Sequence, residues 1–555
     1  MKEHIKRISI LIFSICLIGI LIYTEQKSER NDKTISLYFK VGNEVIKTWE
    51  NEGTYFLFLP SYAAEERIVL TPYSPEFYVV KQGRYISKNE NISDIIKNQK
   101  VECQLAKSGK QFQLCIMQSE NIPAMFIDIN NNSLEELKAD KEHEVSGKMR
   151  VIDPNNSIEE IHAFKVMKAR GNTSFTGFEK KSYSLILSEK ESILGLPAGE
   201  GYALISNASD LSLIRNDIVR SMEVALELPF SHVGKFVDLY VNGEYEGNYY
   251  LCDKLEVGPE RIDINNMETL MDLIYSVRNY ESVEIYENEN AKARKFQISP
   301  KDISGGYLIE REYLNRFQLE FSDIESAFVT DAKECFVVKN PNYCSVEQVE
   351  YIRQFINEAE KAILSSDGKN WENGKYYWEY IDVDSFVKKY LAEEVSKNYD
   401  AGVTSSFFYK NSDVKNGKLI AAPGWDYDMC FGNYLEWMEE FSADPTGVSK
   451  LSFNANHSPW YAKLYEKPEF YELIEQNYWK SVEPFLQELL EDKIDDYENM
   501  LKASANMNAI RWFEELNENH LYEDRKEIYK KLKSFILERK TYLDEAWSLE
   551  KTQES

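Results

Sequence analysis

The spacing of apolar residues changes once along this chain, near Ser345, and that change restricts the fold more than any other feature. Before it, short runs of β-branched and aromatic residues alternate with turn residues, which is typical of strands. After it, apolar residues recur with helical spacing in segments such as "SVEQVEYIRQFINEAEKAIL" and "RKEIYKKLKSFILERKTYLDEAW". The sequence therefore predicts an α+β chain with a mainly β N-terminal half and a helical C-terminal half.

The β half itself is predicted to divide near residue 140. From Ile35 to about Ile129, runs such as "GTYFLFLP" follow one another without a strong helical pattern, which favours a small β-sandwich. The acidic stretch "LEELKADKEHEVSG" then marks a boundary. We assign residues 32–140 to the sandwich, residues 141–545 to a second domain and residues 546–555 to a tail.

Residues 1–31 have the pattern of a signal anchor followed by a spacer. Lys2, Lys6 and Arg7 precede an unbroken apolar run over residues 8–23, and a polar stretch follows without a small-x-small cleavage site. We expect an uncleaved anchor whose basic end lies in the cytoplasm, with the rest of the chain outside the membrane. A buried core helix is the alternative, since the run is a little short for a span of about 20 residues.

Two pairs of cysteines flank segments that contain a turn. Cys103 and Cys115 bracket a predicted hairpin, and Cys335 and Cys344 bracket "FVVKNPNY". Each pair is placed to form a disulfide across its turn, which an oxidising compartment permits. Free thiols are the equal alternative, because local spacing does not establish pairing.

Composition excludes some classes of function. The net charge of −28 argues against a nucleic-acid-binding protein, which needs a basic face for the phosphate backbone. The six histidines include no pair at metal-ligand spacing, which argues against a histidine-zinc enzyme. An acidic chain is compatible with basic protein substrates and with divalent cations.

The segment "APGWDYDMCFGN", residues 422–433, carries two aspartates around one tyrosine. Residues 418–422 read as a short buried strand that Pro423 and Gly424 end. If the chain stays extended beyond them, Asp426 and Asp428 share a face, because alternate residues of a strand do so. Two adjacent carboxylates repel each other unless a cation lies between them, so the pair indicates a divalent metal site. Two solvated aspartates in a turn are the alternative.

A third aspartate follows the predicted helix "DSFVKKYLAEEVSKNYD". Asp384 is its expected N-cap, and Asp400 lies at its far end. A carboxylate there opposes the helix macrodipole, so folding alone does not favour it. Asp400 is therefore a candidate for chemistry, with a solvated aspartate at a helix end as the alternative.

Cations accompany two predicted turns. In "VMKARGNTSFTGFEKKSYSLIL", Arg170 precedes a Gly-Asn-Thr-Ser turn, and a strand with Lys180 and Lys181 at its start follows. Free backbone N–H groups flanked by cations suit phosphate oxygens, although an ordinary hairpin with exposed lysines has the same pattern. Asn242-Gly243 is a strong hairpin signal, and the second strand of that hairpin delivers Lys254.

Taken in order, these motifs resemble the CotH kinase family, which is named for a spore-coat protein. The resemblance rests on "RGNTSF…KKSYSL", "YVNGEYEGNYYL", "GGYLIE", "DSFVKKYLAEE…NYDAGVTSSFFYK" and "APGWDYDMCFGN", and it covers roughly residues 125–545. It implies a highly diverged protein-kinase-like fold for the second domain. It also implies an enzyme that uses ATP with Mg²⁺ or Mn²⁺ to phosphorylate serine, and also threonine, on proteins at the surface of a bacterium.

The resemblance also implies roles for single residues. Asp426 corresponds to the metal-binding aspartate, Asp428 supports the same ion, and Asp400 matches the catalytic aspartate that receives the hydroxyl proton. The phosphates of the nucleotide would be held by cations, namely Arg170, Lys181 and, as a weaker candidate, Lys254.

The remaining residues of the aspartate segment are assigned to packing. These are Trp425, Tyr427 and Phe431. Gly424 departs from the family, which often has an apolar residue there, and this leaves the end of the strand less well defined.

Two other classes of function fit parts of the pattern. A cell-surface binding or adhesion protein with an inactive kinase-like domain suits the anchor, the sandwich and the acidic surface. A carboxylate hydrolase, such as a glycosidase, suits the aspartates but leaves the phosphate-like turn unexplained. For the kinase, we expect protein substrates that are basic and serine-rich, membrane association through the anchor, and no nucleic-acid partner.

Overall fold

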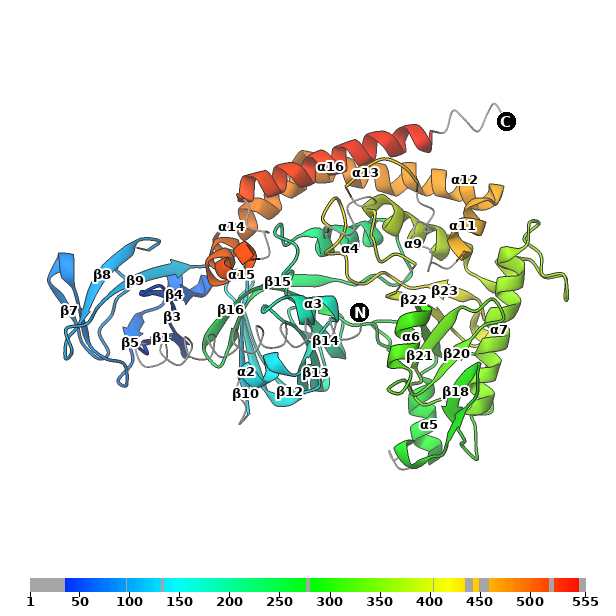
Figure 1. Ribbon diagram of the computed structural model, residues 1–555, viewed down its shortest axis with the longest axis horizontal. Coiled ribbons are helices and arrows are strands. Elements are labelled where there is room, and N and C mark those ends of the chain that lie inside the picture. The colour runs from blue at the N-terminus through cyan, green and yellow to red at the C-terminus, as the bar shows by residue number, and fades with distance from the viewer. Residues whose placement is uncertain are drawn as a thin grey trace, which may run out of the picture.

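The computed structural model describes residues 35–95, 97–130, 134–275, 280–402, 404–434, 443–448, 459–518 and 524–548 (Figure 1). The expected signal anchor lies outside these residues. Among the helices that are described, none is long and apolar enough to cross a bilayer.

Two β-sheets lie at the N-terminal end of the described chain, drawn in blue in Figure 1. One has the strand order β2-β1-β5 and the other β3-β4-β9-β8-β6-β7. The strands are β1 (Tyr38–Val41), β2 (Glu44–Lys47), β3 (Trp49–Asn51), β4 (Thr54–Leu59), β5 (Ile68–Leu70), β6 (Phe77–Val79), β7 (Arg84–Ile86), β8 (Lys100–Leu105) and β9 (Gln111–Gln118).

A separate sandwich, as predicted from the sequence, is not confirmed. The buried side chains of these two sheets belong to one cluster that also contains Phe126, Tyr240 and Tyr245 from the next sheet, and Met507 from a C-terminal helix. Lys47 N also donates to Gly243 O at 2.9 Å, so the N-terminal strands dock directly on the hairpin turn of the neighbouring barrel. The apolar surface is thus shared with the rest of the chain.

Seven strands close a barrel in the order β10-β11-β12-β13-β14-β16-β15. They are β10 (Ala124–Ile129), β11 (Val145–Asp153), β12 (Ile158–Arg170), β13 (Ser182–Glu191), β14 (Gly199–Ile205), β15 (Gly234–Val241) and β16 (Glu244–Asp253). Asn242 and Gly243 both have positive φ, +50° and +79°, which confirms the predicted tight hairpin. On β13, Tyr183, Leu185 and Leu187 point into the barrel core, so the alternate residues Ser182 and Ser184 lie on its outer face.

A second seven-stranded sheet lies at the opposite end of the molecule from the N-terminal sheets (Figure 1), in the order β17-β18-β20-β21-β19-β22-β23. Its strands are β17 (Ile285–Glu287), β18 (Ala291–Arg294), β19 (Tyr307–Glu312), β20 (Ala327–Val329), β21 (Cys335–Asn340), β22 (Ser406–Lys410) and β23 (Leu419–Ala421). Strand β23 confirms the short strand expected just before the aspartate segment.

Helices link the barrel to this sheet and line one long side of the molecule, where α16 is drawn in red (Figure 1). The short ones are α2 (Leu134–Ala139), α3 (Thr173–Gly177), α6 (Leu314–Glu320), α8 (Tyr377–Tyr380), α11 (Trp460–Tyr465), α13 (Glu483–Glu488) and α15 (Phe513–Glu518). The longer ones are α4 (Arg215–Ala225), α5 (Met267–Tyr275), α7 (Val346–Leu364), α9 (Val383–Ser396), α12 (Pro468–Asn477), α14 (Ile494–Arg511) and α16 (Arg525–Ala546). Their concentration after residue 345 confirms the predicted change of period, and the chain is a mixed α and β protein.

Among the residues that the structure describes, no two cysteines form a disulfide. Cys103, Cys115, Cys335 and Cys344 are all buried free thiols, so the disulfide alternative is wrong. The register of β8 and β9 explains the first pair, because Cys103 lies opposite Phe112 and not opposite Cys115.

Candidate active site

The Asp400 carboxylate lies in a loop beyond α9, not at the helix end as predicted. The helix begins after Asp382, whose side chain accepts from Ser385 N, so Asp382 and not Asp384 is the N-cap. It ends at Ser396, where Lys397 takes a left-handed conformation with φ of +50°. Asp400 follows four residues after the end of the helix, so the macrodipole argument does not account for its position.

The aspartate segment is not extended either. Asp426 has φ of +64°, a left-handed conformation that ends any strand-like alternation with Asp428. The carboxylate of Asp428 instead accepts a hydrogen bond from Ser209 Oγ at 2.5 Å, in a loop between β14 and α4. The premise of a shared strand face is therefore wrong, although the structure still brings the aspartates together.

Electrostatics show that the three carboxylates are close neighbours. Burial and the charges of Asp426 and Asp428 together raise the pKa of Asp400 to about 7, while the charge of Arg316 opposes them. Burial, followed by the charge of Asp426, raises the pKa of Asp428 to about 6. Three mutually repelling carboxylates gain stability from a cation placed among them.

The three carboxylates can hold a divalent ion only if a bound molecule supplies further oxygen atoms to it. Within the described residues, no group of three His, Cys, Asp or Glu side chains is arranged to hold a metal. Mg²⁺ is usually bound through one or two carboxylates together with water and substrate phosphates, and not in an all-protein cage. Asp426 and Asp428 can supply such a pair, and the phosphates of a bound nucleotide would complete the shell.

Cations lie next to the aspartate segment. The guanidinium of Arg170 stacks 4.6 Å from the Trp425 ring centroid, and Trp425 directly precedes Asp426. Lys254 Nζ donates to Ser184 Oγ at 3.0 Å on the outer face of the barrel. Burial, together with the charges of Arg170, Lys339 and Lys168, lowers the pKa of Lys254 to about 8. Arg170 and Lys254 are therefore neighbours in a positive patch, which meets the aspartate segment through the contact of Arg170 with Trp425.

Lys339 is a further cation of this patch that sequence reasoning missed. It also lowers the pKa of Lys254, and its ammonium lies 3.2 Å from Glu310 on β19. The signal for it was weak, because it is a lone lysine near the end of the apolar run of β21.

The third predicted phosphate ligand is placed differently. Lys181 Nζ donates to the backbone carbonyl oxygens of Phe175, at 2.7 Å, and Phe178. Its ammonium therefore closes the turn that contains α3, and the charges that influence it do not include Arg170 or the aspartates. The structure places Arg170 beside the aspartate segment, on the Trp425 ring, and groups Lys254 with Arg170, whereas Lys181 is bound within its own turn.

The residues assigned to packing have more specific contacts. Phe431 is buried in the main apolar core, as expected. Trp425 is sandwiched, because Arg220 lies 5.1 Å from the same ring that Arg170 contacts. The hydroxyl of Tyr427 donates to carboxylates at 2.8 and 3.0 Å, so this side chain is not packing alone.

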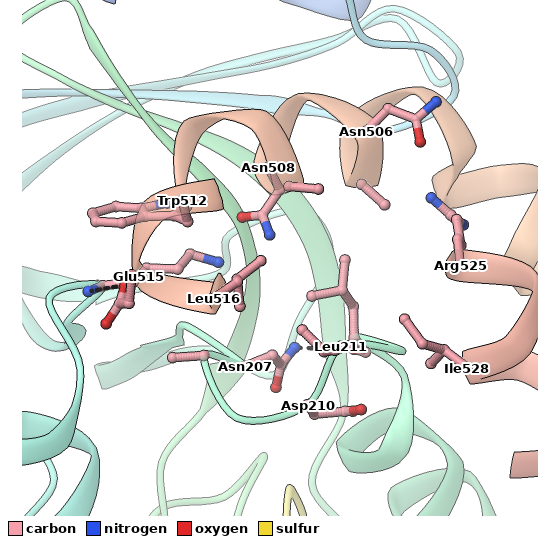
Figure 2. Close-up of a pocket in the computed structure, with 15 residues that line it drawn as sticks. Asn207, Asp210, Leu211, Asn506, Asn508, Trp512, Glu515, Leu516, Arg525 and Ile528 are labelled. Atoms are coloured by element: carbon pink, nitrogen blue, oxygen red, sulfur yellow. Dashed lines mark hydrogen bonds between the residues drawn. The ribbon is translucent and has the colours of Figure 1, made fainter. Parts of the chain in front are cut away.

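A cavity of about 70 Å³ lies beyond the loop that carries Ser209 (Figure 2). Asn207, Asp210 and Leu211 of that loop face Trp512 and Leu516 across it. None of the predicted site residues lines this cavity.

Comparison with known proteins identifies the family. The family model described as CotH kinase protein matches residues 167–543. The chain belongs to the CotH kinase family. The match begins within β12 and covers every predicted site residue, from Arg170 to Asp428, whereas the N-terminal sheets lie outside it. No curated protein matches the chain. Membership in the CotH family implies a protein kinase, and the mixed α and β fold is consistent with that.

Proposed function

We propose that this CotH protein transfers the γ-phosphoryl group of ATP to serine or threonine hydroxyls of proteins, with Mg²⁺ or Mn²⁺ as the metal. The observation that carries the proposal is the meeting of Asp400, Asp426 and Asp428, with Arg170 beside them on the Trp425 ring. Phosphoryl transfer needs this combination, because metal and cations neutralise the phosphates while a carboxylate receives the hydroxyl proton.

The roles divide according to the surroundings of each group. Asp426 and Asp428 would hold the ion, which neutralises phosphate charge when it is bound. Arg170 and Lys254 would hold the phosphate oxygens. Asp400, whose pKa is raised to about 7 by burial and by the other two carboxylates, would accept the proton of the substrate hydroxyl.

The substrate and location are proposed on charge and on the N-terminal pattern. A chain with a net charge of −28 and a carboxylate-rich site attracts basic proteins, so we propose serine-rich basic substrates. The basic residues before the apolar run at 8–23 support membrane anchoring, with the site outside the cytoplasm of a bacterium.

The test separates metal binding from proton transfer. ATP affinity at several Mg²⁺ concentrations, the rate of phosphorylation of a basic serine-rich protein, and the melting temperature are measured for each variant. Asp426→Asn is expected to abolish activity by weakening binding of the metal-nucleotide complex. Asp428→Asn is expected to do so less completely and to raise the Mg²⁺ requirement. Asp400→Asn should leave ATP affinity nearly intact and lower the rate by about 10²–10⁴-fold.

Asp238→Asn is the matched control. Asp238 is also a buried carboxylate whose pKa burial raises to about 6, but it accepts hydrogen bonds from Tyr245 on β16 and Ser504 on α14. It is expected to alter stability and not the Mg²⁺ requirement. ATP binding without any phosphoryl transfer by the wild-type chain would favour the inactive binding protein instead. Identical Mg²⁺ dependence of Asp400→Asn and Asp426→Asn would refute the division of roles.

A further inference from the structure

The hydroxyl of Tyr427 lies between two carboxylates that come from different helices. Its distance is 2.8 Å to Glu223 Oε1 on α4 and 3.0 Å to Glu393 Oε1 on α9. The side chain is fully buried, and α4 and α9 pack against each other. One phenol proton can be donated to only one acceptor at a time, so the hydroxyl is shared between the two acids.

Each of these carboxylates is also tied to a loop of the site. Glu223 Oε1 accepts from Gly424 N at 2.8 Å, at the start of the aspartate segment. Glu393 Oε2 accepts from Asn398 Nδ2 at 2.9 Å, and Asn398 Oδ1 accepts from Asp400 N at 3.3 Å. A continuous chain of hydrogen bonds therefore runs from the Asp400 loop through Glu393 and Tyr427 to Gly424.

The backbone of the tyrosine is held as well. Tyr427 N, between the two metal-binding candidates, donates to Asn216 Oδ1 at 3.0 Å. The side chain and the backbone of Tyr427 are thus both fixed by residues outside the segment, while Asp426 has a left-handed backbone that a free loop would rarely adopt.

We propose that Tyr427 is a positioning residue that sets the separation between Asp400 and the pair Asp426 and Asp428. The proposal rests on the proposed kinase function. Mg²⁺ demands near-ideal geometry at about 2.0–2.1 Å from its ligands, and a displacement of about 1 Å can cost about 10²-fold in rate. A link that connects both aspartate loops is therefore needed for reaction as well as for folding.

The test compares Tyr427→Phe with Tyr478→Phe in the full chain. Tyr478 is a matched control, because it is equally buried and its hydroxyl donates to Asp544 Oδ1 at 2.7 Å, in the C-terminal helices. Tyr427→Phe is expected to raise the Mg²⁺ concentration for half-maximal rate about tenfold and to lower kcat about 10–100-fold. Tyr478→Phe is expected to lower the melting temperature about as much as Tyr427→Phe does, but to leave the Mg²⁺ requirement and kcat unchanged.

Two readouts keep this result distinct from the kinase proposal. If the wild-type chain phosphorylates its substrate and Tyr427→Phe has the same kcat and Mg²⁺ requirement as Tyr478→Phe, the positioning role is refuted and the kinase stands. If the wild-type chain transfers no phosphoryl group, the kinase proposal fails, and Mn²⁺ affinity in the presence of ADP, measured by electron paramagnetic resonance, decides the role. Equal Mn²⁺ affinity in wild type and Tyr427→Phe overturns it, and weaker binding in the variant supports it.

Should Tyr427→Phe fail to fold, Asn398→Ala interrupts the same chain of hydrogen bonds next to Asp400. It is expected to lower kcat at saturating Mg²⁺ by about tenfold. An unchanged kcat in that variant overturns the proposal.

Discussion

Replacement of Gly424 by alanine tests whether the space around the Tyr427 hydroxyl is as restricted as the structure indicates. Gly424 does not have a positive φ, so its backbone accepts an L side chain. A Cβ atom there, however, would lie 1.7 Å from Tyr427 Oη and 2.5 Å from Glu393 Oε1. Contacts below 3.0 Å essentially never occur for a real Cβ, so the buried ring must move.

The cost follows from what the ring loses. Displacing the hydroxyl removes its hydrogen bond to a charged acceptor, worth about 1.5–3 kcal/mol, and leaves two carboxylates without it. Overpacking of a closed core adds about 1–3 kcal/mol. The lower entropy of the unfolded chain offsets about 0.4–1 kcal/mol. We expect Gly424→Ala to lower the free energy of unfolding by about 3 kcal/mol and to abolish phosphorylation.

Urea unfolding followed by tryptophan fluorescence measures the effect, with Gly258→Ala as the control. Gly258 has no positive φ, and no heavy atom lies within 4 Å of its ideal Cβ, so this substitution should change stability by less than about 1 kcal/mol. Equal stability of the two variants would show that the ring is free to move, and it would contradict the argument that Gly424 reserves room for Tyr427.

Three further predictions concern single side chains. Burial raises the pKa of Glu360 from its usual 4.5 to about 7, so its contribution to stability is complete below pH 4.5 and is lost as the pH rises through 7. Glu360→Gln should therefore reduce the pH dependence of the free energy of unfolding, measured with urea, by about 2–3 kcal/mol between pH 5 and 8, and an unchanged slope would refute that pKa. Lys254→Gln should raise the KM for ATP about 10–100-fold, as expected for loss of a charge-assisted hydrogen bond. Lys181→Gln should mainly lower the melting temperature. If instead Lys181→Gln raises the KM and Lys254→Gln only lowers the melting temperature, Lys181 is the phosphate ligand. Cys103 and Cys115 should both be alkylated after unfolding without reductant, and a mass two hydrogens lower would indicate a disulfide.

Local patterns in the sequence were sufficient for the elements that depend on near neighbours. The Asn242-Gly243 hairpin follows from backbone conformation alone, because few residues accept positive φ at two successive positions. The helical half follows from apolar spacing, since each helix must bury one face. Strands were also predicted for the N-terminal part, but the separate sandwich predicted there is not confirmed, because Phe126 and Tyr240 of the barrel enter the same core.

Contacts between distant segments explain what the sequence did not reveal. In the sequence, Lys181 and Lys254 cannot be told apart, because each lies next to a predicted strand. In the structure, Lys181 donates to carbonyl groups of its own turn, whereas Lys254 donates to Ser184 on the outer face of the barrel. The register of β8 and β9 likewise separates Cys103 from Cys115 by placing Phe112 opposite Cys103. The contact of Lys254 depends on which residue of another strand lies beside it, whereas the contacts of Lys181 depend on how its own turn folds.

The aspartates come together in the structure, although the backbone conformation predicted for them was wrong. Charge chemistry selected them, because carboxylates that repel each other need a cation whatever backbone carries them. The extended backbone assumed for Asp426 was wrong, and so was the helix-end position of Asp400. The aspartate segment is held by Glu223 and Glu393, two buried acids on the helices that flank it. Neither acid belongs to a known metal or phosphate motif. Removing the carboxylate of Glu223 or Glu393 should therefore disturb the three aspartates as much as removing a residue that contacts them directly. The reason is that groups outside the aspartate loops set the position of each aspartate.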